Sequence, residues 1–363
     1  MTDKMKEYLP GKLHIIWTIA SKDIVDATRT KLVLSLIIAL AAMLLLPKTV
    51  GLLIDLPFTE LALYDPGGSW LAEQMEASDR FRVHRASSLP ELEAMVSESI
   101  RVEIGLVVPP GFDHMLAAGE LPQLAGHVAW ANRLKGREMA DDLEQQLTEL
   151  LGRLVHINIE GNIVTQTGSG RVLGMLSATA ITIIITVGTS LVPHLMFEEK
   201  RTKTMEALLL SPASIGQVIT GKALAGAFYV LVAAGVMFAV NWAGVAHWWI
   251  ALLFSVCSAL FAVAMGLLLG SLFDSSREIS GSMAVIILAL VAPLYAEMVS
   301  INWPEGLVPL IPWIPSVALS KVYRFSFSGS VNLDQLWLNL GIVLGAALLL
   351  YAGVIWAVRR SDR

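Results

Sequence analysis

The stretch Phe197-Glu-Glu-Lys-Arg-Thr-Lys-Thr-Met-Glu-Ala-Leu-Leu-Leu-Ser-Pro212 separates two long apolar runs of this chain. The run before it spans Val172–Phe197, and the run after it spans Gln217–Trp242. Each exceeds the roughly 20 residues that a helix needs to cross about 30 Å of hydrocarbon. We therefore expect a short charged connection between two membrane helices. Its Leu-rich face is suited to docking on another protein at the membrane surface.

The composition is that of a membrane protein, with 55% hydrophobic and 16% charged residues. The bilayer core offers no hydrogen-bond partners to the backbone. Spanning segments of this kind are therefore helical, because a helix pairs its own backbone groups. Six runs are predicted to span the membrane: Leu32–Leu53, Val172–Phe197, Gln217–Trp242, Trp248–Phe273, Ser282–Ile301 and Leu336–Val358. The first begins about 30 residues in and is too long for the apolar part of a cleaved signal peptide, so we expect it to be retained.

The basic residues predict the orientation of these helices. They gather in the leader, in the connection at residues 197–214 and in the tail Arg359–Arg363, whereas the turn near Gly244 has none. The positive-inside bias places both termini and the connection in the cytoplasm. Residues 55–170 are rich in acids and follow a single crossing, so we expect them outside. The basic residues lie beside the membrane, which does not indicate nucleic-acid binding.

Four parts follow from this pattern. Residues 1–31 are predicted as a cytoplasmic leader, and residues 32–54 as the first transmembrane helix. Within the leader, Ile15–Thr30 is either an interfacial elbow helix or an ordinary charged leader before a membrane helix. Residues 55–170 are predicted as an extracytoplasmic α/β domain, and residues 171–363 as a five-helix transmembrane region with a coupling loop at 197–214. The fold class is thus mainly α, with six transmembrane helices and an inserted α/β extracytoplasmic domain.

Short strand-like and helix-like segments, separated by turn residues, alternate along the outer domain and predict its elements. The expected strands are Leu61–Tyr64, Phe81–His84, Ile104–Val108 and His127–Trp130, and the expected helices are Ser69–Ser78, Pro90–Ser99 and Phe112–Gly119. Leucines at helical spacing from Leu143 to Leu154 predict a stalk helix that leads back to the membrane. This domain is either a lid or spacer, or a part that binds a ligand or an adaptor.

One motif in the chain imitates a nucleotide site. Gly216-Gln-Val-Ile-Thr-Gly-Lys222-Ala223 has phosphate-loop spacing, but Ala223 lacks the hydroxyl that holds magnesium, and no strand precedes it. We expect Lys222 to snorkel to the cytoplasmic interface instead. The chain is therefore not expected to be an enzyme or to carry a cofactor. If transport is powered, ATP and Mg are expected on a separate partner subunit.

Cysteine and histidine usage points away from other classes of site. Cys257 is the single cysteine and lies inside an apolar run, so no disulfide framework stabilises the outer domain. The seven histidines have no metal-ligand spacing, so no structural metal is expected. A bacterial inner membrane suits this composition, with the chain as a multi-pass protein.

Polar residues inside the apolar runs are candidates for a transport pathway or a dimer seam. Four threonines recur along one helix face: Thr179, Thr182, Thr186 and Thr189. Their other interpretation is ordinary helix packing, with each hydroxyl bonded to its own helix. Glu297 is an acid near a helix end and marks a further pathway site, or simply reaches the interface.

Small residues and prolines predict further local features. Gly266-Leu-Leu-Leu-Gly270 and Gly341-Ile-Val-Leu-Gly345 indicate close helix contacts. Trp303–Pro315 is too rich in proline to span, so we expect it either to form broken turns at the outer interface or to re-enter the membrane slightly. A short amphipathic helix is expected to follow over Ser316–Phe325.

The charged connection resembles the coupling segment of type-2 ABC transporter permeases, which reads roughly Glu-Arg-Glu-x-Gly-Thr-x-Glu-x-Leu-Leu-x-Ser-Pro. Lys203 stands where that family usually has Gly, so the local turn is expected to differ. The resemblance implies ATPase-coupling roles for Glu198, Glu199, Lys200, Arg201, Thr204, Glu206, Leu208, Leu209, Ser211 and Pro212. It covers leader, span, outer domain and five further spans.

The resemblance implies a permease subunit of an ABC exporter that moves a hydrophobic or amphipathic compound, such as a drug or lipid-like molecule, outward by alternating access. Its expected partners are an ABC ATP-binding subunit, a second permease copy or a homologous permease, the lipid bilayer and a periplasmic adaptor protein. Two alternatives stay open: a sodium-efflux permease of the same family, and a membrane-anchored receptor whose outer domain binds a ligand.

Overall fold

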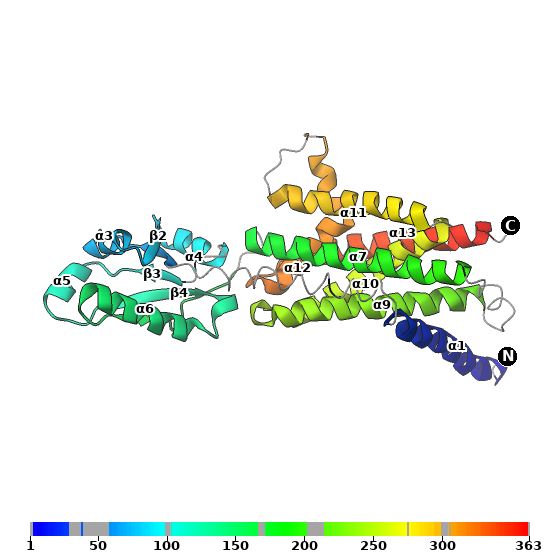
Figure 1. Ribbon diagram of the computed structural model, residues 1–363, viewed down its shortest axis with the longest axis horizontal. Coiled ribbons are helices and arrows are strands. Elements are labelled where there is room, and N and C mark those ends of the chain that lie inside the picture. Colours follow the sequence, from blue (N-terminus) through cyan, green and yellow to red (C-terminus); the bar gives the residue numbers. More distant parts are fainter. Residues whose placement is uncertain are drawn as a thin grey trace.

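The computed structural model describes residues 3–28, 38, 58–98, 102, 104–165, 171–201, 214–273, 276–298, 304 and 306–361. The molecule is elongated. A sheet unit, made of residues 58–165, lies at one end, and a helical bundle lies at the other (Figure 1). Both termini lie at the end of the bundle away from the sheet unit. The described residues are mostly helical and include a small α/β region, as the sequence predicts.

The bundle consists of α1 and of the helices that follow the sheet unit in the chain. Its elements are α1 (Asp3–Thr28), α7 (Arg171–Arg201), α9 (Ile215–Val240), η2 (Trp242–Gly244), α10 (Trp248–Leu272), α11 (Ser276–Met298), η3 (Val308–Trp313), α12 (Pro315–Phe327) and α13 (Leu333–Ser361). Among the residues that the structure describes, four helices are long and apolar enough to cross a membrane, over Leu173–Met196, Gly216–Val240, Trp248–Leu272 and Leu333–Val358.

These four segments agree with four of the six predicted spans. The apolar part of α11, Gly281–Ala296, is shorter than the others. The predicted span Leu32–Leu53 lies outside the described residues except for Ile38. The number of six spans therefore stays a prediction.

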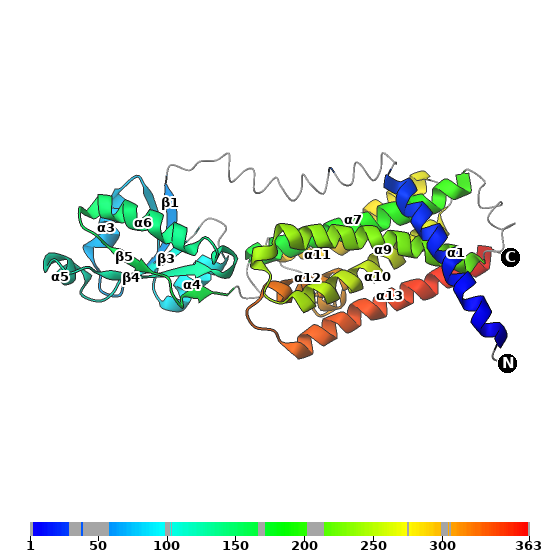
Figure 2. The same ribbon diagram turned by 90° about the horizontal axis from the view of Figure 1, so that it is seen from below.

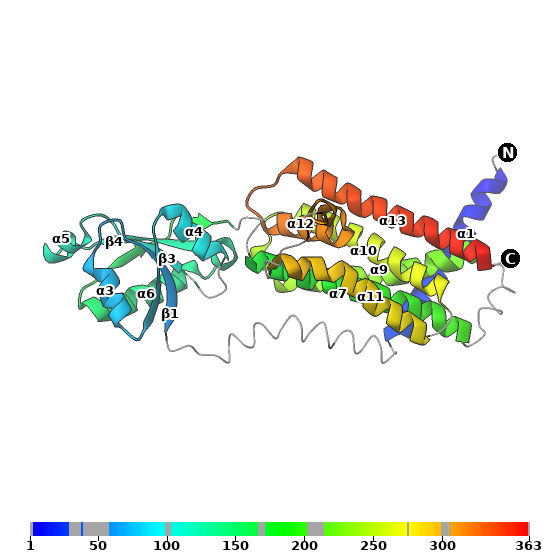
Figure 3. The same cartoon turned by 90° about the horizontal axis from the view of Figure 1, so that it is seen from above.

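The helices pack around α7 and α10, which contact each other along much of their length. α12 lies between them and α13, so this short helix is enclosed within the bundle (Figure 3). One continuous apolar cluster joins these helices, with Phe254, Phe261 and Tyr323 among its fully buried members. Burial of large side chains of this kind holds the helices together by close packing rather than by polar contacts.

The described part of the sheet unit contains six strands. They are β1 (Thr59–Tyr64), β2 (Phe81–Ala86), β3 (Ile104–Val107), β4 (Gln123–Ala129), β5 (His156–Asn158) and β6 (Ile163–Val164). The strand order is β2-β1-β3-β4-β5, with β6 also paired to β4. Only the β3–β4 pair is antiparallel. The first four strands confirm the prediction, whereas β5 and β6 were not predicted.

Helices cover both faces of this sheet. They are α3 (Trp70–Ala77), α4 (Leu89–Glu98), α5 (Phe112–Ala117) and α6 (Gly136–Leu151). Side chains alternate across each strand, and β1 illustrates the result. Leu61 and Leu63 belong to the core under α3, α5 and α6, whereas Ala62 belongs to the core under α4. The sheet unit thus has apolar cores of its own, separate from that of the bundle.

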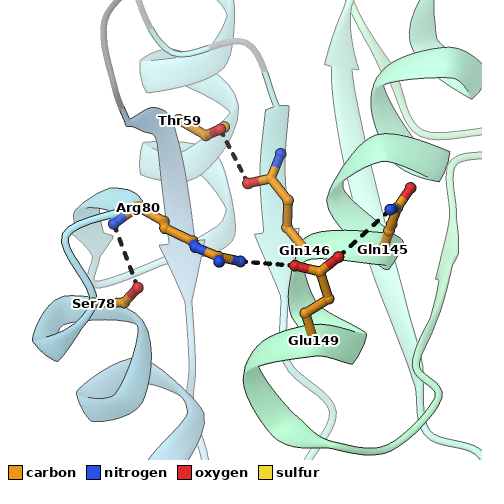
Figure 4. A network of polar contacts seen from close by, with 6 residues as sticks. All are labelled: Thr59, Ser78, Arg80, Gln145, Gln146 and Glu149. Carbon is orange, nitrogen blue, oxygen red and sulfur yellow. Dashed lines mark hydrogen bonds and ion pairs between the residues drawn. The ribbon is translucent and has the colours of Figure 1, made fainter.

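The helix expected as a stalk is instead a layer of the sheet unit. Ala140, Leu143 and Leu147 of α6 are buried against the strands. At the start of β1, α6 is also held by polar contacts (Figure 4): Thr59 Oγ1 donates to Gln146 Oε1 at 3.3 Å, and Arg80 donates to Glu149 at 2.8 Å. Because the leucine face of α6 packs on the sheet, this helix is not a separate stalk that leads to the bundle.

The sheet unit meets the bundle through two short helical turns. These are η1 (Trp130–Asn132) and η2. Arg133 donates from one guanidinium nitrogen to the carbonyl of Ala243 and stacks over the Trp130 ring, 4.2 Å from its centroid. This contact ties the sheet unit to the connection between α9 and α10.

Candidate coupling site

The predicted coupling segment begins where α7 ends and finishes where α9 starts. Glu198, Glu199, Lys200 and Arg201 form the last helical residues of α7. Their side chains lie outside the description, as do Thr204, Glu206, Leu208, Leu209, Ser211 and Pro212 as whole residues. Their ATPase-coupling role stays a prediction.

A defined cap starts α9 directly after this segment. The Ser214 side chain accepts from the Gln217 backbone N–H, and the Gln217 side chain accepts from the Ser214 backbone N–H at 2.8 Å. This capping box satisfies two backbone donors that the first turn of a helix leaves without partners. The end of the coupling segment is therefore fixed to a rigid helix start.

Helix α1 crosses α9 obliquely near the same end (Figure 2). Gly221 of α9 allows the close approach, because a Cβ there would lie only 2.7 Å from the Ile19 side chain. The Tyr229 hydroxyl donates to the carbonyl of Ile24 at 2.5 Å. Leu13 and Trp17, nearer the start of α1, are exposed. The predicted helix at Ile15–Thr30 is confirmed up to Thr28, and its place at the membrane interface stays a prediction.

Lys222 is buried, so the expectation that it snorkels is wrong. Its side chain is 1% exposed, and its ammonium lies 3.4 Å from Asp23 Oδ2 of α1. The same ammonium donates to the carbonyl of Leu195 in α7 at 3.0 Å. A snorkelling lysine needs a free path to water, and here α1 closes that path. Residues 216–223 are also continuous helix, which does not fit a phosphate loop.

The threonine face of α7 is partly satisfied within its own helix. Thr182 donates to the Ala178 carbonyl and Thr189 to the Ile185 carbonyl, each at 2.7 Å. Thr189 is buried, while Thr179, Thr182 and Thr186 are half-buried. Their role in a pathway or a dimer seam stays a prediction. So does that of Glu297, which lies near the end of α11 and whose side chain is outside the description.

Glycines bring α7 and α10 into direct contact. A Cβ at Gly266 would overlap the Gly188 carbonyl, and one at Gly270 would lie 2.7 Å from Met196 Sδ. The prediction of a close contact at Gly266–Gly270 is confirmed. At Gly341 and Gly345 of α13, however, a Cβ would meet nothing within 4 Å in the described chain. The second small-residue face has no neighbour there.

A buried polar cluster inside the bundle was not predicted. Arg324 of α12 is 9% exposed, and its Nε donates to the Ser177 hydroxyl at 3.2 Å. Ser177 lies on α7, and its hydroxyl also pairs with that of Ser320 at 2.9 Å. The sequence signal was a single arginine on a short amphipathic helix. Only the enclosure of α12 by other helices makes it interior.

In the described part of the proline-rich segment, a turn leads into η3, and α12 follows it as predicted. Between η3 and α11 the structure has a cavity of about 290 Å³ with almost wholly apolar walls. Its lining residues are Ala289, Ala292, Pro293, Leu307, Leu310, Ile311 and Ile314. Within the described ranges, no group of three His, Cys, Asp or Glu residues is placed to hold a metal ion.

Together these features define a multi-pass membrane protein with an apolar helical interior. The profile of the family described as ABC-2 family transporter protein matches residues 30–356. The chain therefore belongs to that family. No match to the chain is found among curated proteins.

Proposed function

We propose that this chain is the membrane-spanning permease subunit of an ABC exporter. A separate ATP-binding subunit drives it, and a second permease copy or a homologous permease completes the membrane part. The observation that carries the proposal is the family match over residues 30–356. The charged connection between α7 and α9 supports it, because pressure on that connection acts on two spanning helices at once.

The proposal includes a topology. Six helices span a bacterial inner membrane, the first being residues 32–54, and both termini are cytoplasmic. The sheet unit lies outside as part of an extracytoplasmic domain over residues 55–170. In support, the sheet unit and the termini lie at opposite ends of the molecule. The basic residues of the tail and of the coupling segment belong to the end with the termini.

The proposed substrate is a hydrophobic or amphipathic compound. Its support is the apolar character of the bundle interior and of the cavity between α11 and η3. A pocket of that kind binds apolar groups by removing their surface from water. A periplasmic adaptor is a further proposed partner of the exposed sheet unit.

The first test is co-purification with the ATP-binding protein encoded beside this chain. We expect a stable complex with ATPase activity, and stimulation of that activity by amphipathic dyes in proteoliposomes. If sodium alone stimulated the ATPase activity, the result would favour the alternative, a sodium-efflux permease. A chain that purifies without any ATP-binding partner would contradict the permease assignment and favour a receptor.

The coupling segment is tested by charge reversal. We expect Glu206→Lys or Glu199→Lys to reduce dye-dependent ATPase activity at least about tenfold, equivalent to about 1.4 kcal/mol, while folded chain remains in the membrane. Glu138→Lys is the matched control, because Glu138 is exposed on α6 of the sheet unit. Equal activity in all three variants would remove the coupling role.

A further inference from the structure

The ion pair between Asp23 and Lys222 is buried, with side-chain exposures of 7% and 1%. Removing two opposite charges from water is unfavourable, and well-packed apolar residues often replace such a pair with no loss of stability. A buried pair is therefore weak evidence for stability. Its best-attested use is to fix one arrangement of helices against its alternatives.

Lys222 contacts two other helices from its own. Its ammonium lies 3.4 Å from Asp23 of α1 and 3.0 Å from the Leu195 carbonyl of α7. Both α7 and α9 flank the coupling segment, since it runs from residue 197 to residue 214. The lysine thus attaches α1 to α7 and α9, the two helices that flank that segment.

The ion pair and the apolar contacts around it differ in how strictly they fix the register of α1. Ala27, Leu191, Leu195 and Ala225 form a small buried cluster shared by α1, α7 and α9. A slide of α1 by one helical turn is about 5.4 Å, which would take Asp23 out of reach of the ammonium. The apolar contacts alone would tolerate such a slide better, because they are not directional.

We propose that Lys222 is a positioning residue for coupling: it fixes α1 to the ends of α7 and α9, so that these three segments move as one body. The inference rests on the proposed function, in which an ATP-binding subunit presses on the coupling segment. Without the Asp23–Lys222 ion pair, α9 would move relative to α1. Part of the displacement would then be lost at the α1–α9 contact.

The test measures the distance between spin labels on Thr28→Cys of α1 and Thr220→Cys of α9, both exposed positions, in a Cys257→Ser background. The complex with its ATP-binding subunit is compared without nucleotide and after trapping with ATP and vanadate. We expect one narrow distance, equal in both states. Lys222→Met should broaden that distance and make it change on trapping, whereas Lys222→Arg should restore it.

Lys22→Met is the matched control, because Lys22 is exposed on α1 next to Asp23. It should leave the distance unchanged. If Lys222→Met does not fold, the double variant Asp23→Leu/Lys222→Met replaces it, since it removes both charges of the pair. A folded variant of either kind that keeps the narrow, nucleotide-independent distance overturns the inference.

The two proposals fail differently. Loss of the ATP-binding subunit from the unaltered chain contradicts the proposed function. The distance in the isolated chain then still decides whether Lys222 fixes α1 to α9, because broadening in Lys222→Met requires no nucleotide. Coupled ATPase activity adds a second readout: we expect at least a threefold loss in Lys222→Met and none in Lys22→Met.

Discussion

Ser177 has two polar partners from one other helix, because its hydroxyl meets both Arg324 and Ser320 of α12. The same hydroxyl donates to the Gly174 carbonyl of its own helix at 2.8 Å. In a low-dielectric interior, such hydrogen bonds are stronger than in water, and a missing partner is costly. A single small side chain thus connects α7 to α12.

We expect Ser177→Ala to destabilise the chain by about 1–3 kcal/mol, since a buried guanidinium donor loses this acceptor. Ser255→Ala is the matched control, because the Ser255 hydroxyl donates to the Ala251 carbonyl of its own helix. The measurement is the free energy of unfolding in detergent. Equal stability of the two variants would contradict the prediction.

His127 gives the sheet unit a pH dependence. It is 7% exposed in β4, and burial lowers its pKa below the ordinary value, while the negative charge of Glu93 opposes that shift. Its Nδ1 lies 3.8 Å from Glu93, too far for a hydrogen bond. The folded chain therefore binds this proton less readily than the unfolded chain does.

Stability from neutral His127 is fully present above the unfolded pKa of about 6.5. It is lost as the pH falls from there toward the lowered folded pKa, with a slope of at most about 1.4 kcal/mol per pH unit. We expect His127→Gln to flatten the profile of unfolding temperature between about pH 7 and pH 5. A variant that keeps the profile of the unaltered chain would refute this assignment.

At the residue scale, the sequence located Lys222 but not its surroundings. Its position in an apolar helix suggested a snorkelling lysine, because an isolated helix always offers a path to the interface. The partner lies 199 positions away in the chain. Sequence patterns alone do not show that Asp23, an acid of the amphipathic leader, pairs with Lys222.

Among the elements, α7 and α10 make the closest contact, through Gly188, Gly266 and Gly270. Small residues let two helix backbones approach, which is the main source of attraction between helices in lipid. α13 has the same spacing at Gly341 and Gly345 without a neighbour in the described chain. The motif therefore identifies a helix face capable of contact, and packing decides whether contact occurs.

We expect Gly266→Ala to destabilise the bundle by about 1–3 kcal/mol, because the new methyl overlaps backbone that cannot move aside. Gly341→Ala is the matched control and should be neutral or gain up to about 1 kcal/mol of helix propensity. Unfolding in a denaturing detergent compares the two. Equal losses at both positions would show that the α7–α10 contact is not the cause.

Element prediction succeeded where the pattern was long or clearly punctuated. β1 to β4 and α3 to α5 follow alternating or helical patterns between turns such as Asp65–Gly68. β5 and β6 have three and two residues, too few to show a period of two. For α6, the leucine spacing gave the helix but not the surface that it covers.

Across the whole molecule, charge is distributed along the long axis. The sheet unit carries most of the acidic excess, and the end with the termini carries basic residues such as Lys22 and Arg360. This distribution follows the positive-inside bias. The orientation itself stays a prediction, and hydropathy does not give the position of the first span relative to the bundle.

We expect a membrane-impermeant maleimide to label Asp142→Cys on intact cells and Arg360→Cys only after permeabilisation. Both positions are exposed, on α6 and on the last turn of α13, and Cys257→Ser removes the native thiol. Labelling of Arg360→Cys on intact cells, or protection of Asp142→Cys, would reverse the proposed orientation.

The strand order has a consequence for biosynthesis. β1 is the first strand of the sheet to be made, yet it lies between β2 and β3. At about 5–20 residues per second, several seconds pass between completion of β1 and of β3. During that interval β1 has at least one unpaired edge, which is open to pairing with other chains. The newly made chain is thus at its most vulnerable to aggregation before its bundle is complete, and a holdase that binds Thr59–Tyr64 would protect it at that stage.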